Sequence, residues 1–106
     1  MLVVLALKVL RNIMVVGILS IKVVMRSSHS LKDKRRIVKS LKDRTRNKFN
    51  VSVSEIEDQD NYKCSKIGVA MVGTDRQYVN SKLSSIISSF RFFPQAELVD
   101  YELDLI

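Results

Sequence analysis

The side chains that could act as acids, bases or nucleophiles are few and far apart in this sequence. Its 106 residues include one histidine, His29, and one cysteine, Cys64. A single cysteine excludes an intramolecular disulfide and a cysteine-rich zinc site, and a single histidine excludes a histidine-cluster metal centre. Cys64 has no partner histidine near it in sequence, so we expect a small structural side chain. We therefore predict a protein without enzymatic activity, cofactor or metal.

Three carboxylates near the C-terminus recur at every second residue, at Asp100, Glu102 and Asp104. This spacing places them on one face of a strand. A metal site would need further ligands, which the sequence does not supply. We expect instead that Lys22 and Arg26, in the neighbouring strand, form cross-strand ion pairs with these acids.

Positive charge is the chemistry that the sequence concentrates in one segment. The formal net charge is +7, and residues 30–49 alone contain nine cations and two anions, so this segment holds the whole excess. At about 100° per residue, five of these cations fall in a helical stripe about 80° wide and about 21 Å long, enough to meet several phosphates. The basic stripe consists of Lys32, Arg35, Lys39, Lys42 and Arg46.

The alternative interpretation of the basic stripe is an ordinary solvated helix face, because Lys and Arg are good helix formers. Exposed helices usually mix charges to gain i,i+4 pairs, and only Lys39 and Asp43 offer that spacing here. We therefore predict a polyanion-binding helix, to which Arg36 also contributes. The expected partner is RNA or a ribosomal particle, bound by its phosphates rather than by its base sequence.

His29 and Ser30 precede this helix, where backbone amides and the helix dipole favour an anion. A bound phosphate is therefore one interpretation of these two residues. The other is that Ser30 only caps the helix and that His29 is an exposed turn residue. The Ser-x-x-Asp spacing from Ser30 to Asp33 favours this second interpretation.

Alternating strand and helix patterns must position these residues. The predicted strands cover residues 14–26, 51–57, 62–73 and a final segment around 99–105, and the predicted helices cover 30–49 and 75–91. The β-α-β-β-α-β order predicts a ferredoxin-like α+β fold, with a four-stranded antiparallel sheet and two helices on one face. A single domain over 14–106 is expected.

Side-chain periodicity predicts which residues of the later elements face the core. In the final strand, Val99, Tyr101, Leu103 and Leu105 are expected to point inward. The second helix is expected to bury Tyr78 together with its aliphatic side chains.

Residues 1–13 precede the first predicted strand and are mostly apolar. Lys8, Arg11 and Asn12 interrupt them, so neither a signal peptide nor a membrane span of about 20 apolar residues fits. An N-terminal extension created by an upstream start codon and a genuine structured arm both remain open. We expect a cytoplasmic protein that does not bind membranes.

The sheet face away from the helices is predicted to be rather apolar for a solvated surface. Residues expected there are Met14, Val16, Ile18, Val24 and Leu98. Its central strands offer almost no aromatic residue, which argues against base stacking on the sheet. An exposed apolar face usually marks an interface, so we expect a homodimer. The alternative function is thus a protein-interaction module, whose basic helix contacts an acidic protein. A small-molecule regulatory domain would need a glycine-bearing ligand loop, which is absent.

Several short runs resemble one bacterial family. They are SLKDKRR at 30–36, KFNVSVSE at 48–55, Gln59-Asp60 and IGVA at 67–70. Over about residues 14–90 the chain resembles the YlxP-like family of unknown function, although members often have Trp and Gln where this chain has Tyr62 and Lys63. The resemblance implies a ferredoxin-like domain. Family genes often lie among those for translation and ribosome maturation, which implies an association with RNA or ribosomes.

Overall fold

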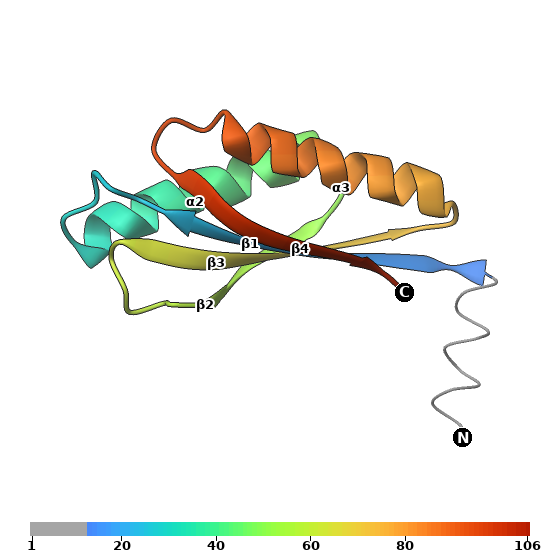
Figure 1. Ribbon diagram of the computed structural model, residues 1–106, viewed down its shortest axis with the longest axis horizontal. Helices are drawn as coiled ribbons and strands as arrows, with labels where there is room; N and C mark the ends of the chain where they lie inside the picture. The colour runs from blue at the N-terminus through green and yellow to red at the C-terminus, as the bar shows by residue number, and fades with distance from the viewer. Residues whose placement is uncertain (1–12) are drawn as a thin grey trace, which may run out of the picture.

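The computed structural model describes residues 13–106, so the predicted extension over 1–13 lies outside the described residues apart from Ile13. The elements are β1 (Val15–Val24), α2 (Leu31–Lys48), β2 (Ser52–Glu57), β3 (Cys64–Gly73), α3 (Arg76–Arg91) and β4 (Glu97–Leu105) (Figure 1). All strand pairs are antiparallel, and the sheet order is β2-β3-β1-β4. The predicted ferredoxin-like α+β fold is confirmed.

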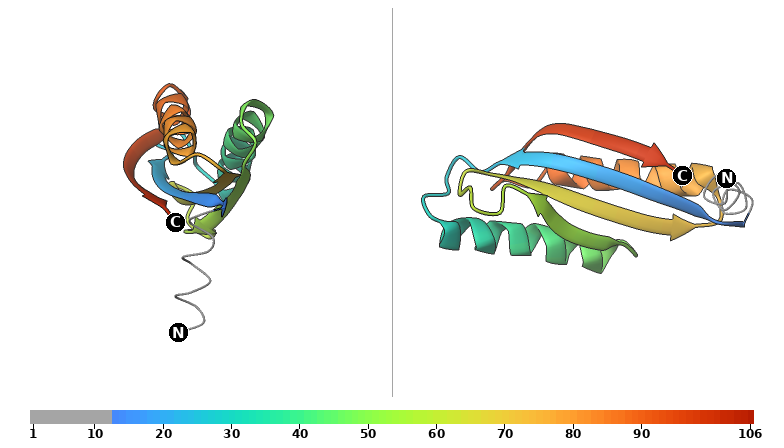
Figure 2. Two further views of the ribbon diagram at one scale, coloured as in Figure 1. Left: turned by 90° about the vertical axis from the view of Figure 1, so that its right-hand side faces the viewer. Right: turned by 90° about the horizontal axis from the view of Figure 1, so that it is seen from below.

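The molecule has two layers. Both helices lie side by side on one face of the sheet, and no described element covers the opposite face (Figure 2). We call that opposite side the open face. The core lies between the helices and the sheet, where alternate residues of the central strands meet the apolar sides of the helices. Among residues 13–106, no helix is long and apolar enough to span a membrane.

Gly17 allows α3 to approach the sheet closely. A Cβ atom at this position would lie 2.5 Å from Leu83 Cδ1 and 2.6 Å from Val79 Cγ1. Both of these helix side chains are completely buried. The glycine is therefore required by packing against α3, since any larger side chain would displace the helix.

Three predicted core positions are wrong, at Val99, Tyr101 and Tyr78. Tyr101 pairs with the buried Ile21 but is 43% exposed, because β4 is an edge strand of the sheet. Val99 is 45% exposed, because β4 contains an extra residue there: Leu98 pairs with Val23, and the next pair joins Asp100 to Lys22. Leu98 therefore packs against the core instead of lying on the open face. Tyr78 is 53% exposed. Successive helix residues are rotated by about 100°, and this rotation places Tyr78 well to the side of the buried stripe of α3.

Candidate nucleic-acid interface

The first turn of α2 is fixed by a reciprocal cap. Ser30 Oγ accepts a hydrogen bond from the Asp33 amide, and Asp33 Oδ2 accepts one from the His29 amide, both at 3.0 Å. The hydrogen bond from His29 is the main cause that lowers the pKa of Asp33, and the Arg36 guanidinium adds to it. A phosphate beside His29 and Ser30 would meet this carboxylate, so the weaker anion site stays a prediction and has no part in the proposal below.

Three members of the basic stripe project from α2 without an ion-pair partner in the described part of the chain. Lys32 and Arg35 are exposed and Lys42 is half-buried. None of them forms an ion pair with any residue of the range 13–106. Their charge is thus available for an anion from outside the molecule.

The other three predicted residues have partners within the protein. Lys39 Nζ lies 2.7 Å from Asp43 Oδ2, and this hydrogen bond is the main cause that lowers the pKa of Asp43. Arg36 pairs with Asp33 at 3.1 Å. Arg46 donates a hydrogen bond of 2.8 Å to the carbonyl oxygen of Val53, in the edge strand β2. Exposed ion pairs contribute little to stability, so Lys39 and Arg36 can exchange a carboxylate for a phosphate, whereas Arg46 also positions β2.

Lys34 is the residue whose role the charge pattern does not reveal. Its side chain is 1% exposed, and its Nζ lies 2.7 Å from Glu55 Oε2 and donates to the carbonyl oxygen of Asp58. Glu55 Oε2 also accepts a hydrogen bond of 2.5 Å from Ser65 Oγ. One of the nine cations therefore belongs to the core. Helical spacing could have shown this, since Lys34 falls on the same face as Ile37, Val38 and Leu41.

The acidic row lies in the opposite layer from the basic stripe. Asp100, Glu102 and Asp104 belong to β4, where Asp100 pairs with Lys22 in the strand register. The predicted ion pairs are wrong: Lys22 makes no ion pair within residues 13–106, and Arg26 binds Glu97 at 2.9 Å. Arg26 lies just beyond the end of β1, next to the pair formed by Val24 and Glu97, and so cannot reach the row.

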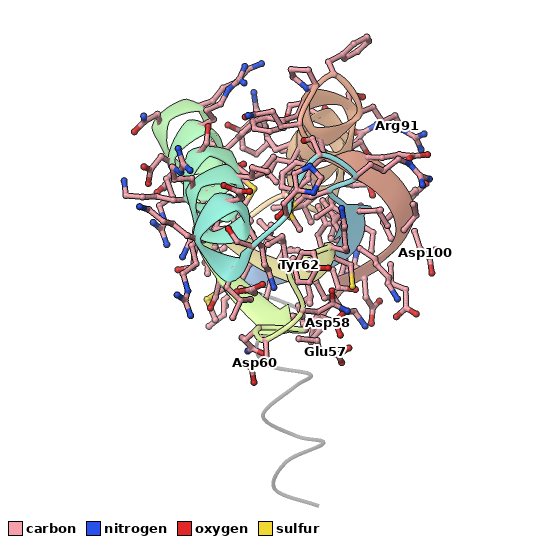
Figure 3. All side chains as sticks on the ribbon, turned by 90° about the vertical axis from the view of Figure 1, so that its left-hand side faces the viewer. Glu57, Asp58, Asp60, Tyr62, Arg91 and Asp100 are labelled. Carbon is pink, nitrogen blue, oxygen red and sulfur yellow. The ribbon has the colours of Figure 1, made fainter. Side chains whose placement is uncertain are left out.

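The charge distribution follows the layers. Side-chain nitrogens line the outer side of α2, whereas the labelled Asp58, Asp60 and Asp100 lie on the sheet side of the molecule (Figure 3). Within the described residues, no three His, Cys, Asp or Glu side chains come together as a metal site. The arrangement of these side chains therefore favours electrostatic attraction of an anion to the helix layer.

Comparison with known proteins places the chain in a family. Residues 16–103 match the family described as Protein of unknown function (DUF503). The chain belongs to this family. Among DUF503 relatives, it is 33% identical over 82 residues to the uncharacterized protein YlxP of Bacillus subtilis (strain 168), and the match covers 77% of this chain and 89% of YlxP.

One solved structure supports the fold of this DUF503 chain. The de novo designed protein Foldit4 superposes with a TM-score of 0.53 at 17% identity, over 88% of this chain and 96% of that protein. A variant of SnoaB, a cofactor-independent oxygenase from Streptomyces nogalater, gives a TM-score of 0.43 at 13% identity, over 88% and 90% of the two chains. The second likeness is too low to bear on activity.

Proposed function

We propose that this protein is a non-enzymatic, cytoplasmic protein that binds the phosphates of RNA, free or in a ribosomal particle, through α2. The observation that carries this proposal is the set of three stripe cations that have no ion-pair partner among residues 13–106, namely Lys32, Arg35 and Lys42. They lie along one side of a helix with capped ends, so their spacing is held before binding. Contacts of this kind give affinity and orientation without reading sequence.

The geometry also limits the direction of approach. The acidic row of β4 belongs to the sheet and would repel a polyanion, whereas α2 lies in the other layer (Figure 1). RNA is therefore expected to contact the helix layer. The resemblance to a family encoded near translation genes agrees with this partner class.

The test is a fluorescence-anisotropy titration of labelled RNA at several salt concentrations. The variant K32Q/R35Q/K42Q removes the three unpartnered charges, and the control K22Q/R76Q/K82Q removes three charges from β1 and α3, so both have the same net charge. Each lost phosphate contact lowers the slope of log K against log salt by about 0.7–0.9. We expect the slope to fall by about 2 in the first variant and to stay unchanged in the control. Equal slopes in all three proteins, or no binding at low salt, would contradict the proposal.

A second candidate function is self-association through the open face. Val16 pairs with Val72 and Ile18 with Ala70, which makes a continuous apolar patch on the two central strands. Val72 is 63% exposed and Ile18 is 43% exposed. The same face carries the acidic row of β4 and the lysines Lys22 and Lys66, so a second copy related by a two-fold axis can offer acids to lysines.

Light scattering at micromolar concentration tests this association. The wild type is expected to have the mass of a dimer, and Val72→Lys is expected to have the mass of a monomer with unchanged circular dichroism. A monomeric wild type excludes the homodimer. If partners of the basic helix survive nuclease treatment in a pull-down, they favour an acidic protein partner over RNA.

A further inference from the structure

Phe92, directly after α3, is the most exposed large hydrophobic side chain among residues 13–106. It is 86% exposed, and the next values are 66% for Ile13 and 63% for Val72. A phenyl ring in water gains nothing for folding, because it buries almost no apolar surface. The exposure of this ring therefore indicates a contact with a ligand from outside the folded protein.

The neighbouring residues hold this ring in place. Phe93 is 6% exposed and belongs to the core, and the Arg44 guanidinium lies 5.2 Å from the centroid of its ring. Pro94 fixes its own φ angle and restricts the backbone of Phe93. Phe93 therefore attaches the segment to α2, which leaves the adjacent Phe92 directed to solvent.

Two hollows line the boundary between α2 and the segment that follows α3. One, of about 100 Å³, is bordered by Arg44 and Lys48 of α2 and by Phe93. The other, of about 490 Å³, is bordered by Ser27, Asp33, Arg36 and Gln95. Three of these side chains are cations of α2: Arg44 and Lys48 lie on the side away from the basic stripe, whereas Arg36 lies about 40° from Lys32, at the edge of the stripe. Phe92 lines neither hollow but directly precedes Phe93, which borders the smaller one. The one carboxylate, Asp33, is already paired with Arg36.

We propose that Phe92 and the two hollows between α2 and residues 93–95 bind single-stranded RNA at an unpaired base. Phe92 stacks on the base, and Arg36, Arg44 and Lys48 hold the flanking phosphates. An aromatic ring stacks only on a base that has left a duplex, because paired bases present their edges alone. The cationic border favours a nucleotide over an apolar peptide segment. Arg91 is not part of the site, because it lies on the side of α3 away from α2 (Figure 3).

This inference rests on the proposed function and adds that the RNA is single-stranded at this point. The chain contains no tryptophan, so Phe92→Trp introduces a single tryptophan at the stacking position, which can be excited selectively over the three tyrosines. The control is Tyr78→Trp, near the opposite end of α3, where the ring is also exposed and a lysine, Lys82, lies 5.4 Å from its centroid. Titration with an oligouridylate of about 12 nucleotides is expected to quench the fluorescence of the first variant only. Inorganic polyphosphate, which has phosphates but no bases, is expected to quench neither.

Affinity measurements separate the two proposals. We expect Phe92→Ala to weaken binding of the single-stranded oligonucleotide about tenfold, Phe92→Tyr to restore it, and neither to change binding of an RNA duplex. An equal effect on both RNAs, no effect on either, or quenching by polyphosphate would overturn the stacking site. In those cases the proposed function still stands if K32Q/R35Q/K42Q lowers the salt slope. If the wild type binds neither RNA at low salt, both proposals fail.

Discussion

At the scale of single residues, Lys34 has the largest structural role among the cations of α2. Its ammonium group joins α2 to Glu55 in β2 and to the carbonyl oxygen of Asp58, where the chain leaves β2. Asp58 has a φ of 64°, a conformation that is uncommon outside glycine. The contact with Lys34 therefore fixes a local turn as well as the position of the helix.

The first prediction concerns this buried ion pair. Lys34→Ala is expected to lower the free energy of unfolding by about 3–5 kcal/mol, because Glu55 loses its buried counter-charge. The double variant K34M/E55L is expected to be much less affected, since neither member is left unpaired. Urea unfolding followed by circular dichroism measures both. Equal losses in the single and double variants would show that the two charges are not coupled.

The second prediction concerns acid. The pKa of Asp33 in the folded protein lies below its ordinary value of 3.8, chiefly because of the hydrogen bond from the His29 amide. A lowered pKa means that the ionised cap stabilises the fold above pH 3.8 and that this contribution disappears as the pH falls through the folded value. The difference in urea midpoint between wild type and Asp33→Ala should thus shrink from neutral pH to about pH 2. A constant difference would mean that the carboxylate charge is not what stabilises the cap.

At the scale of elements, both edge strands contain an irregularity. β2 has Ile56 as an extra residue between the pairs made by Glu55 and Glu57, and β4 has Val99 as an extra residue. Such bulges increase the local twist and disfavour pairing with a further strand. Association of copies is consequently expected through the open face and not through the sheet edges.

The third prediction concerns the contact between α3 and the sheet. Gly17→Ala is expected to cost about 1–3 kcal/mol, because the new methyl group would overlap Leu83 and Val79. Gly68→Ala on the open face is the matched control: its Cβ would meet Ile56 Cγ2 at 2.9 Å, but Ile56 is 46% exposed and can move. Thermal unfolding of the two variants compares them. A larger loss in the control would contradict the tight packing of α3.

At the scale of the whole molecule, the two layers carry different charges. The basic stripe belongs to α2 in the helix layer, and the acidic row belongs to β4 in the sheet layer. Since the Debye length at physiological salt is about 8 Å, charges in the far layer act only weakly on RNA bound at the helices. The molecule should therefore bind RNA in one orientation.

The fourth prediction tests this separation. D100N/E102Q/D104N removes three negative charges and so raises the net charge by three, but it adds no phosphate contact. The salt slope of RNA binding should stay within about 0.5 of the wild-type value, with an affinity gain of less than about threefold at physiological salt. Anisotropy titrations provide both numbers. A slope that rises by about 2 would place RNA on the open face and contradict binding to the helix layer alone.

Local patterns in the sequence were sufficient for the fold. Apolar alternation in β1, helical spacing in α2 and the caps at Ser30 and Asp75 depend on residues close together in the chain. The concentration of charge in residues 30–49 is likewise a property of the sequence alone. These features determined the element order, the two-layer architecture and the helix that we propose as the interface.

Tertiary contacts decided which of the charges remain available. Lys34 is unavailable to a ligand because it forms a buried ion pair with Glu55, and Arg46 donates a hydrogen bond to the carbonyl oxygen of Val53. The extra residue in β4 placed Leu98 inside and Val99 outside, and the chain after α3 brought Phe93 beside Arg44. Helical spacing places Lys34 on the buried face of α2, but it does not identify the partner of Lys34 or predict the other contacts, because each depends on where a second segment lies in space. The sequence thus determined how much charge α2 holds, and the packing of its neighbours determined which side chains can meet a ligand.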